Sequence, residues 1–321
     1  MRIFEKPKLI ISKCIEFEAC RYNGLIISSD IVKQLKDYVE FQPVCPEVEI
    51  GLGIPRDPIR LIDLNKEVHL FQPATGRCLT DNMKKFAKTY LNSLEDFDGF
   101  ILKNKSPSCG VKAVRVYPGQ KEGRPRTDGV GAFASEVFKK YPYLAVEDEG
   151  RLRNLKIREN FLTKIYALSD FRKIKKSNKL NDLIEFHSSN KLLLMAYNQN
   201  LTQKMGRIVA NHEHKSIKEV IGDYENYLLQ ALEKAPAYTS NINILMHSMG
   251  YFSKELSHQE KSFFLESINK YREGILPLIV NLNILKSWIV RFNEEYLAKQ
   301  TFFEPYPEEL MPITTIYNRG F

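Results

Sequence analysis

The sequence predicts an α/β N-terminal domain with a Rossmann-like parallel sheet, followed by an all-α C-terminal helical bundle. Its 321 residues exceed the length of one typical domain. Strand-like and helix-like stretches alternate as far as about residue 150, which is typical of a parallel sheet covered by helices. Beyond about residue 160, long amphipathic stretches follow one another with few turn signals. We therefore expect an α/β domain over 1–155, a basic linker or helix over 156–180 and a helical domain over 181–321.

The expected elements of the first domain are short, and those of the second are long. Three β-rich runs predict strands over 8–12, 40–44 and 99–103. Apolar residues at helical spacing predict a helix over 82–94 in this domain. In the second half, five stretches have the apolar periodicity of helices. They cover 183–208, 217–234, 241–254, 258–273 and 275–297.

Composition and patterning exclude several classes of protein. The longest apolar stretch, 274–290, is interrupted by Pro277, Asn281 and Lys286, so no membrane-spanning helix is expected. The first eight residues lack the apolar run of a signal peptide, which favours a cytoplasmic protein with no membrane partner. Five cysteines are an odd number, and in a reducing compartment they argue against a disulfide framework. Each thiol is then a core residue, a nucleophile or a metal ligand.

The positive charge of the chain is concentrated in its middle. The net charge is +8, yet residues 101–180 alone hold 19 basic and 8 acidic side chains. A basic zone between nearly neutral halves favours a polyanion as partner, and nucleic acid is the most common polyanion in a cytosol. The alternative is that these charges are the solvated faces of a linker and helices. The candidate phosphate contacts are Arg124, Arg126, Arg151, Arg153, Arg172, Lys173, Lys175 and Lys176.

Three cysteines follow predicted strands. Cys14 and Cys45 come just after the first two strands, and Cys109 comes a few residues after the third. Because ligands of open parallel sheets gather outside the carboxyl ends of the strands, these loops can bring three thiolates to one metal site. The alternative is three small buried residues, which is the usual role of cysteine. Cys20 and Cys78 are expected to be structural thiols, although Cys20 is close enough in sequence to replace a ligand.

Several short motifs around these cysteines resemble the thiouracil desulfidase family. They are Ser-Lys-Cys-Ile at 12–15, Arg-Tyr-Asn-Gly at 21–24, Cys-Pro-Glu at 45–47, Gly-Leu-Gly-Ile-Pro-Arg at 51–56 and Ser-Pro-Ser-Cys-Gly at 106–110. The second half resembles a helical domain of unknown function that is often fused to this family. Its matching stretches are 186–191, 247–252, 297–300 and 303–307.

This resemblance implies a cofactor and a substrate. It implies that Cys14, Cys45 and Cys109 bind a 4Fe–4S cluster in which one iron has no protein ligand. The fused form is similar to enzymes that remove sulfur from 4-thiouridine in bacterial tRNA, so the expected partner is tRNA carrying thiolated uridine. The basic zone at residues 101–180 independently favours an RNA partner.

The reaction expected from such a site is the replacement of C=S by C=O, a hydrolysis without net electron transfer. An open iron serves as a Lewis acid that binds the sulfur of the base. Glu47, two residues after a ligand cysteine, is the candidate general base, and the resemblance supports it. Ser106 is the candidate proton donor or relay. The alternatives are a surface or capping carboxylate for Glu47 and a turn-forming hydroxyl for Ser106.

Two other functions are compatible with the sequence. The first is desulfidation of free thiolated nucleobases such as thiouracil, with the basic zone incidental. The second is a non-enzymatic RNA-binding module that contains iron–sulfur or zinc.

We assign structural rather than functional roles to two further features of the sequence. We interpret 129–134 as a tight turn that opens a helix over 132–140, and His187 as a core or capping histidine.

Overall fold

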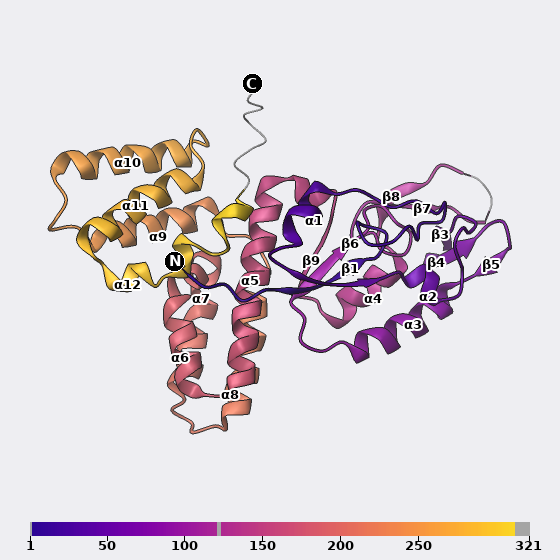
Figure 1. The fold of residues 1–321 in the computed structure, drawn as a ribbon, viewed down its shortest axis with the longest axis horizontal. Coiled ribbons are helices and arrows are strands. Elements are labelled where there is room, and N and C mark those ends of the chain that lie inside the picture. Colours follow the sequence, from indigo (N-terminus) through magenta and orange to yellow (C-terminus); the bar gives the residue numbers. More distant parts are fainter. Residues whose placement is uncertain (1, 121–122, 312–321) are drawn as a thin grey trace. The chain divides into compact units, whose positions relative to one another are not determined.

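The computed structural model describes residues 2–120 and 123–311 (Figure 1). Contacts divide the chain into two compact units. Among the described residues, the α/β unit consists of 3–169 and 308–311, and the helical unit consists of residue 2 and 170–307. The expected fold classes are confirmed. The division falls inside the expected 156–180 segment, and the domain bounds inferred from the sequence stay a prediction.

A four-stranded sheet organises the α/β unit. It consists of β1 (Lys8–Ser12), β2 (Glu40–Val44), β6 (Gly99–Leu102) and β9 (Ala145–Asp148) in the order β2-β1-β6-β9. All of its pairings are parallel, so the carboxyl ends of the strands lie at one edge. β1 occupies a central position, and four of its five residues are buried. The sequence predicts β1 and β2 with these bounds and β6 to within one residue, because apolar residues are concentrated in these runs.

Helices cover this sheet. They are α1 (Asp30–Leu35), α2 (Pro46–Glu49), α3 (Thr80–Ser93) and α4 (Ala132–Lys140), with short 3-10 helices at Arg151–Arg153 and Glu308–Leu310. α3 and α4 pack against each other, as Figure 1 shows. Met83 and Ala87, one turn apart on α3, join Phe133 and Val137 of α4 in one apolar core.

A second sheet in the same unit is absent from the sequence prediction. Its strands are β3 (Arg60–Leu64), β4 (Glu67–Gln72), β5 (Arg77–Cys78), β7 (Val114–Tyr117) and β8 (Arg126–Gly129), in the order β5-β4-β3-β7-β8. β3 and β4 form a hairpin whose two central residues, Asn65 and Lys66, both have positive φ angles of 54° and 70°. The prediction missed these strands because they are short and because this turn contains no glycine.

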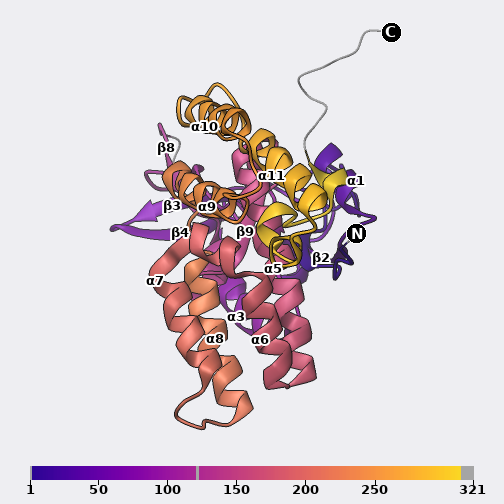
Figure 2. The same cartoon turned by 90° about the vertical axis from the view of Figure 1, so that its left-hand side faces the viewer.

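The helical unit is built from long helices. They are the second part of α5 (Leu155–Ser177), α6 (Leu180–Ser189), α7 (Lys191–Ala210), α8 (Ile217–Ala231), α9 (Tyr238–Gly250), α10 (His258–Arg272), α11 (Leu278–Phe292) and α12 (Glu295–Ala298), followed by a 3-10 helix at Thr301–Phe303. α6, α7 and α8 lie side by side in Figures 1 and 2. Phe264 and Trp288, whose ring centroids are 5.1 Å apart, lie in a core shared by α9, α10 and α11.

Two helices predicted from periodicity are interrupted in the structure. The stretch predicted as one helix over 183–208 is divided at Asn190 into α6 and α7, and α7 is broken again at Asn198 (φ −159°, ψ 98°). The stretch over 275–297 ends at Asn293, which adopts the left-handed conformation (φ 53°). Asparagine tolerates these conformations because its side chain bonds to nearby backbone. Within the described part of the chain, every helix is too short or too polar to span a bilayer.

His187 is held in the helical unit as a half-buried, neutral side chain. Its Nδ1 lies 3.0 Å from the Tyr224 hydroxyl. Burial lowers the pKa of His187 to about 4, and the positive charge of Lys191 lowers it further. The interpretation of this residue as a packed histidine agrees with these contacts.

We expect His187 to make stability dependent on pH. Because its pKa is lower in the folded state, the unfolded chain binds the extra proton between about pH 6.5 and pH 4, and stability falls as pH falls through that window. The size is at most about 3 kcal/mol, from roughly 1.4 kcal/mol per pKa unit, and less for a partly exposed group. Urea unfolding of the full chain between pH 7.5 and pH 4 measures it, and His187→Gln should flatten the slope. Equal slopes for both proteins would contradict this prediction.

Candidate functional site

The carboxyl edge of the parallel sheet carries the cysteine loops. Cys14 lies two residues beyond β1, Cys45 directly follows β2 and begins α2, and Cys109 lies in the loop after β6. The strand-end positions expected from the sequence are therefore present. Cys45 and Cys109 are 8% and 5% exposed, and Cys14 is partly exposed. Cys109 also contacts the Ser12 hydroxyl at the end of β1, which links two of the loops.

The thiols lie close enough to alter one another's ionisation. Burial raises the pKa of Cys109 to about 12. A hydrogen bond with Cys20, together with burial, raises the pKa of Cys45. A hydrogen bond with Cys14 is the main cause that raises the pKa of Cys20 to about 11. Several thiolates gathered in a buried site repel one another, so this donor set favours a bound cation or cluster that offsets their charge.

Free thiols are the donors that an iron–sulfur cluster requires. All five cysteines are free, so no disulfide competes for them. Among residues 2–120 and 123–311, no three His, Cys, Asp or Glu side chains are grouped so that they could hold one metal ion. Thiolates of a four-iron cluster bind different irons, so they do not need to converge on one point. Cys14, Cys45 and Cys109 as the ligands stay a prediction.

Cys20 belongs to the same group of thiols. The sequence favoured a structural role because this residue follows no strand. The structure places it in a buried loop, where its thiol lies near those of Cys14 and Cys45 and its carbonyl accepts from the Cys45 thiol at 3.9 Å. Cys20 lies near Cys14 and Cys45 because its loop folds back toward the sheet. The rule that ligands follow the ends of strands does not predict this position. Cys78, by contrast, is exposed in β5.

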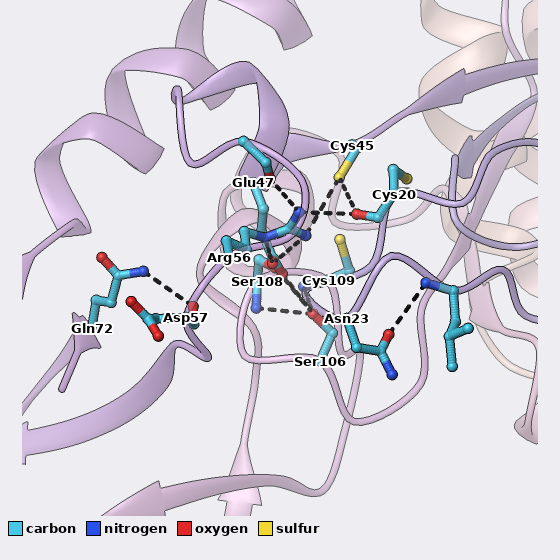
Figure 3. Close-up of polar contacts among 12 residues, drawn as sticks. Cys20, Asn23, Cys45, Glu47, Arg56, Asp57, Gln72, Ser106, Ser108 and Cys109 are labelled. Carbon is cyan, nitrogen blue, oxygen red and sulfur yellow. Dashed lines mark hydrogen bonds and ion pairs between the residues drawn. The ribbon is translucent and has the colours of Figure 1, made fainter. Parts of the chain in front are cut away.

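Glu47 lies beside the thiols, with each carboxylate oxygen held by different partners (Figure 3). Oε2 accepts hydrogen bonds from Nε and Nη2 of Arg56 at 2.9 and 2.7 Å. Oε1 accepts a short hydrogen bond from the Ser108 hydroxyl and a longer one, 3.5 Å, from Ser106. The carboxylate side chain is only 13% exposed, so it is neither a surface nor a free capping group. Its role as a base stays a prediction.

Ser106 and Ser108 both lie beside Glu47, and the role of Ser106 as a proton donor or relay stays a prediction. The Ser106 hydroxyl accepts from the backbone N–H of Ser108 and Cys109 at 3.2 and 3.1 Å, so it shapes the turn before the cysteine. It also lies 3.0 Å from the Ser108 hydroxyl. Ser108 is fully buried and is the closer partner of Glu47. Sequence reasoning missed Ser108, although it lies in the same Ser-Pro-Ser-Cys-Gly motif.

Arg56 connects three loops of the site. Besides Glu47, its guanidinium donates to the carbonyls of Cys20 and Gly53 at 3.0 and 2.9 Å, and Nη2 lies 4.0 Å from the Cys45 sulfur. Its side chain is 3% exposed. Arg56 could have been noticed in the sequence, since it ends the Gly-Leu-Gly-Ile-Pro-Arg motif. Its burial and its contacts with distant loops could not be predicted from the sequence.

The first turn of α4 fixes the Cys109 loop. The N–H groups of Ala132 and Phe133 donate to the carbonyls of Pro107 and Ser108 at 2.9 and 2.8 Å. A Cβ at Gly131 would lie 2.5 Å from the Ser108 carbonyl oxygen, so only glycine allows this approach. These donors bind the loop and are not available for a phosphate, and the segment leads from the end of β8 at Gly129 into α4 at Ala132.

Comparison with known proteins identifies the family. A family model described as 2-thiouracil desulfurase matches residues 9–149. The uncharacterized protein YbbK of Bacillus subtilis (strain 168) is 30% identical over 147 residues, which are 44% of this chain and 95% of that protein. The chain belongs to the 2-thiouracil desulfurase family. The matched range includes all of the cysteine, Glu47 and Arg56 loops described above.

Other similarities extend beyond the α/β unit or concern a solved structure. A second family model, described as a protein of unknown function (DUF1722), matches residues 191–307. The uncharacterized protein YbgA of Escherichia coli (strain K12) is 26% identical over 151 residues, which are 46% of this chain and 89% of that protein. The solved structure of the [4Fe-4S]-dependent thiouracil desulfidase TudS is 26% identical and covers 48% of this chain and 98% of its own, with a TM-score of 0.38.

The basic residues expected to contact phosphate differ in their exposure and in their ion pairs. In the α/β unit, Arg124 and Arg153 are exposed, whereas Arg126 pairs with Asp63 and Asp128, and Arg151 pairs with Glu147. In the helical unit, Lys173 and Lys176 are exposed, Lys175 pairs with Glu225, and Arg172 is 6% exposed. Ion pairs reduce the charge that a side chain offers to a phosphate. That these residues bind RNA stays a prediction.

We expect Arg56→Met to destabilise the α/β unit and to lower iron binding. Removing one member of a buried ion pair leaves the Glu47 carboxylate uncompensated, at a cost of about 3–5 kcal/mol. Chemical unfolding and iron content per chain measure the two effects. Arg77→Met is the matched control, because Arg77 is exposed on β5 and its loss should change stability by less than about 0.5 kcal/mol. Equal stability of the two variants would show that the pair does not hold the site.

Proposed function

We propose that this protein is an iron–sulfur-dependent desulfidase that converts C=S to C=O in a thiolated pyrimidine, with 4-thiouridine in tRNA as its substrate. Membership of the 2-thiouracil desulfurase family supports desulfidase activity on a thiolated pyrimidine. The observation that carries the mechanism is the Glu47 carboxylate, which is oriented by Arg56 and Ser108 next to the cysteine thiols.

The cofactor is a 4Fe–4S cluster held by Cys14, Cys45 and Cys109. The donor set of free thiols supports this assignment, and thiolate is the usual ligand of such clusters. When bound, the cluster supplies a Lewis-acidic iron without a protein ligand that attracts the sulfur of the substrate. Arg56, 4.0 Å from the Cys45 sulfur, stabilises negative charge on that ligand.

The protein's own residues then manage water and protons. Arg56 binds Oε2 of Glu47, and Oε1, which accepts from the Ser108 and Ser106 hydroxyls, is the oxygen that removes a proton from the attacking water. The water oxygen bonds to the thiocarbonyl carbon, and the carbon–sulfur bond breaks. The two protons of the water leave with the sulfur as hydrogen sulfide, so atoms and charges balance without an electron donor. Ser108 and Ser106, 3.0 Å apart, provide a path for a proton between Glu47 and the substrate.

The positive charge of the middle of the chain supports RNA as the substrate. The excess of basic residues over 101–180 begins at the third cysteine loop, which contains Cys109. A base inside folded tRNA has to be turned out of its stack before it reaches such a site. Free thiouracil is the second candidate substrate, and the names of the family and of TudS favour it. The third candidate function is a non-enzymatic RNA-binding module that contains metal. Such a module would not use Glu47 as a general base.

The role of Glu47 is tested by Glu47→Gln in protein with a reconstituted cluster. We expect turnover to fall by about 10²–10⁴-fold, the usual contribution of a general base, while the visible absorbance of the cluster is retained. Glu49→Gln is the control, because Glu49 lies exposed on the same helix, α2. Unchanged turnover in Glu47→Gln would favour the non-enzymatic module.

The substrate is tested by comparing kcat/KM for thiolated tRNA and for free 4-thiouracil. We expect a higher value for tRNA and a steep fall of that value with salt, since phosphate contacts release counterions. Loss of the 4-thiouridine absorbance reports the reaction. Faster turnover of the free base, with no dependence on salt, would assign the enzyme to nucleobases and leave the basic zone without a role in catalysis.

A further inference from the structure

A pocket of about 540 Å³ lies within the helical unit, along α7. This volume is in the range of small-molecule sites, roughly 300–1,000 Å³. Most of its wall comes from α7, and α6 and the turn after α7 supply the rest. The lining residues are His187, Lys191, Met195, Gln199, Thr202, Gln203, Gly206, Arg207, Ala210 and His212.

The charges of this pocket have one sign. Among its lining residues, which all lie in the described part of the chain, Lys191 and Arg207 are cationic and none is acidic. Both of these side chains are exposed, and neither makes an ion pair or side-chain hydrogen bond with another described residue. Many cations elsewhere in the chain have a carboxylate partner, such as Lys175 with Glu225 and Lys215 with Asp223. Unpaired cations in a concave site favour an anionic ligand.

The shape of the pocket follows from the break in α7. Asn198 leaves the helical conformation, and its side chain then caps the continuing helix by accepting from the N–H of Leu201 at 3.0 Å. Thr202 donates to the Asn198 carbonyl at 2.8 Å, which fixes the break. Met195 before the break and Gln199 after it both line the pocket.

His187 provides a further polar group in the wall. Nδ1 is occupied by the Tyr224 hydroxyl at 3.0 Å. The other ring nitrogen, Nε2, faces Gly206, where an added Cβ would be 3.4 Å away, and both residues line the pocket. A side chain larger than glycine's at 206 would occupy the space beside this nitrogen. When Tyr224 donates to Nδ1, Nε2 carries the hydrogen and donates.

We propose that this pocket binds the phosphate group of a nucleotide. Lys191, Arg207 and the donor at His187 contact the phosphate, because guanidinium and ammonium groups are the usual phosphate partners in proteins. Gln199 and Gln203 provide amide donors and acceptors for a base edge, and Met195 provides an apolar contact. The phosphate belongs to a free nucleotide or to an RNA chain. This site is independent of the cysteine site, and binding and desulfidation can each fail without the other.

Calorimetric binding to the full chain tests the proposal with four probes: uridine 5′-monophosphate, inorganic phosphate, uridine and a short oligouridine RNA. The phosphate-bearing nucleotide should bind at least about tenfold more tightly than uridine. Tight binding of the monophosphate assigns the pocket to free nucleotides. Binding of the RNA alone assigns it to a phosphodiester chain. Equal affinity for uridine and the phosphate-bearing probes, or binding of none of them, would overturn the proposal.

Two variants locate the binding. Arg207→Gln removes a charge from the pocket and should weaken every phosphate-bearing probe that binds by about tenfold or more. Gly206→Leu fills the space beside His187 without a change of charge and should abolish binding. Arg272→Gln is the control, because Arg272 is an exposed arginine on α10 that donates to Asn269 at 3.1 Å and does not line the pocket. Equal affinities of Arg207→Gln and Arg272→Gln would show that the ligand binds elsewhere.

Discussion

The buried ion pair between Arg56 and Glu47 determines how the cysteine loops are arranged. Transfer of both charges out of water costs several kcal/mol, and their attraction offsets this cost only when further hydrogen bonds complete the geometry. Here the carbonyls of Cys20 and Gly53 accept from the guanidinium, and the Ser108 hydroxyl donates to the carboxylate. Each of these partners belongs to a loop that carries a thiol or adjoins one. The same contacts that satisfy the buried charges therefore align the thiols and the carboxylate.

The burial of the thiols disfavours negative charge in the site, whereas the Arg56 guanidinium favours it. Burial and mutual contact raise the pKa of Cys109, Cys45 and Cys20, so in the absence of a bound group the protonated forms are favoured at neutral pH. Binding of a cluster has to release those protons, and its affinity then increases with pH. The site is thus balanced between an arginine that favours negative charge and a buried environment that opposes it.

The sequence predicts elements and loops but not the contacts between distant loops. The strands at 8–12 and 40–44 and the helix at 132–140 are marked by dense apolar runs or regular spacing, and the structure has them with these bounds. The rule that ligands gather at the carboxyl ends of parallel strands placed the three cysteine loops together. Arg56, Ser108 and Cys20 escaped prediction as members of the site because their roles depend on loops that are adjacent only after folding. The breaks at Asn190 and Asn198 escaped because apolar periodicity continues across them.

The support that α4 gives to the Cys109 loop has a consequence for the order of assembly. The donors that hold this loop, at Ala132 and Phe133, come more than twenty residues after Cys109 in the chain. A nascent chain that has not yet added these residues contains all the cysteines, but its third cysteine loop lacks its support. The paired strands β7 and β8 lie between this loop and α4 in the chain. The contacts that fix the third cysteine loop are therefore complete only in a chain that extends into α4.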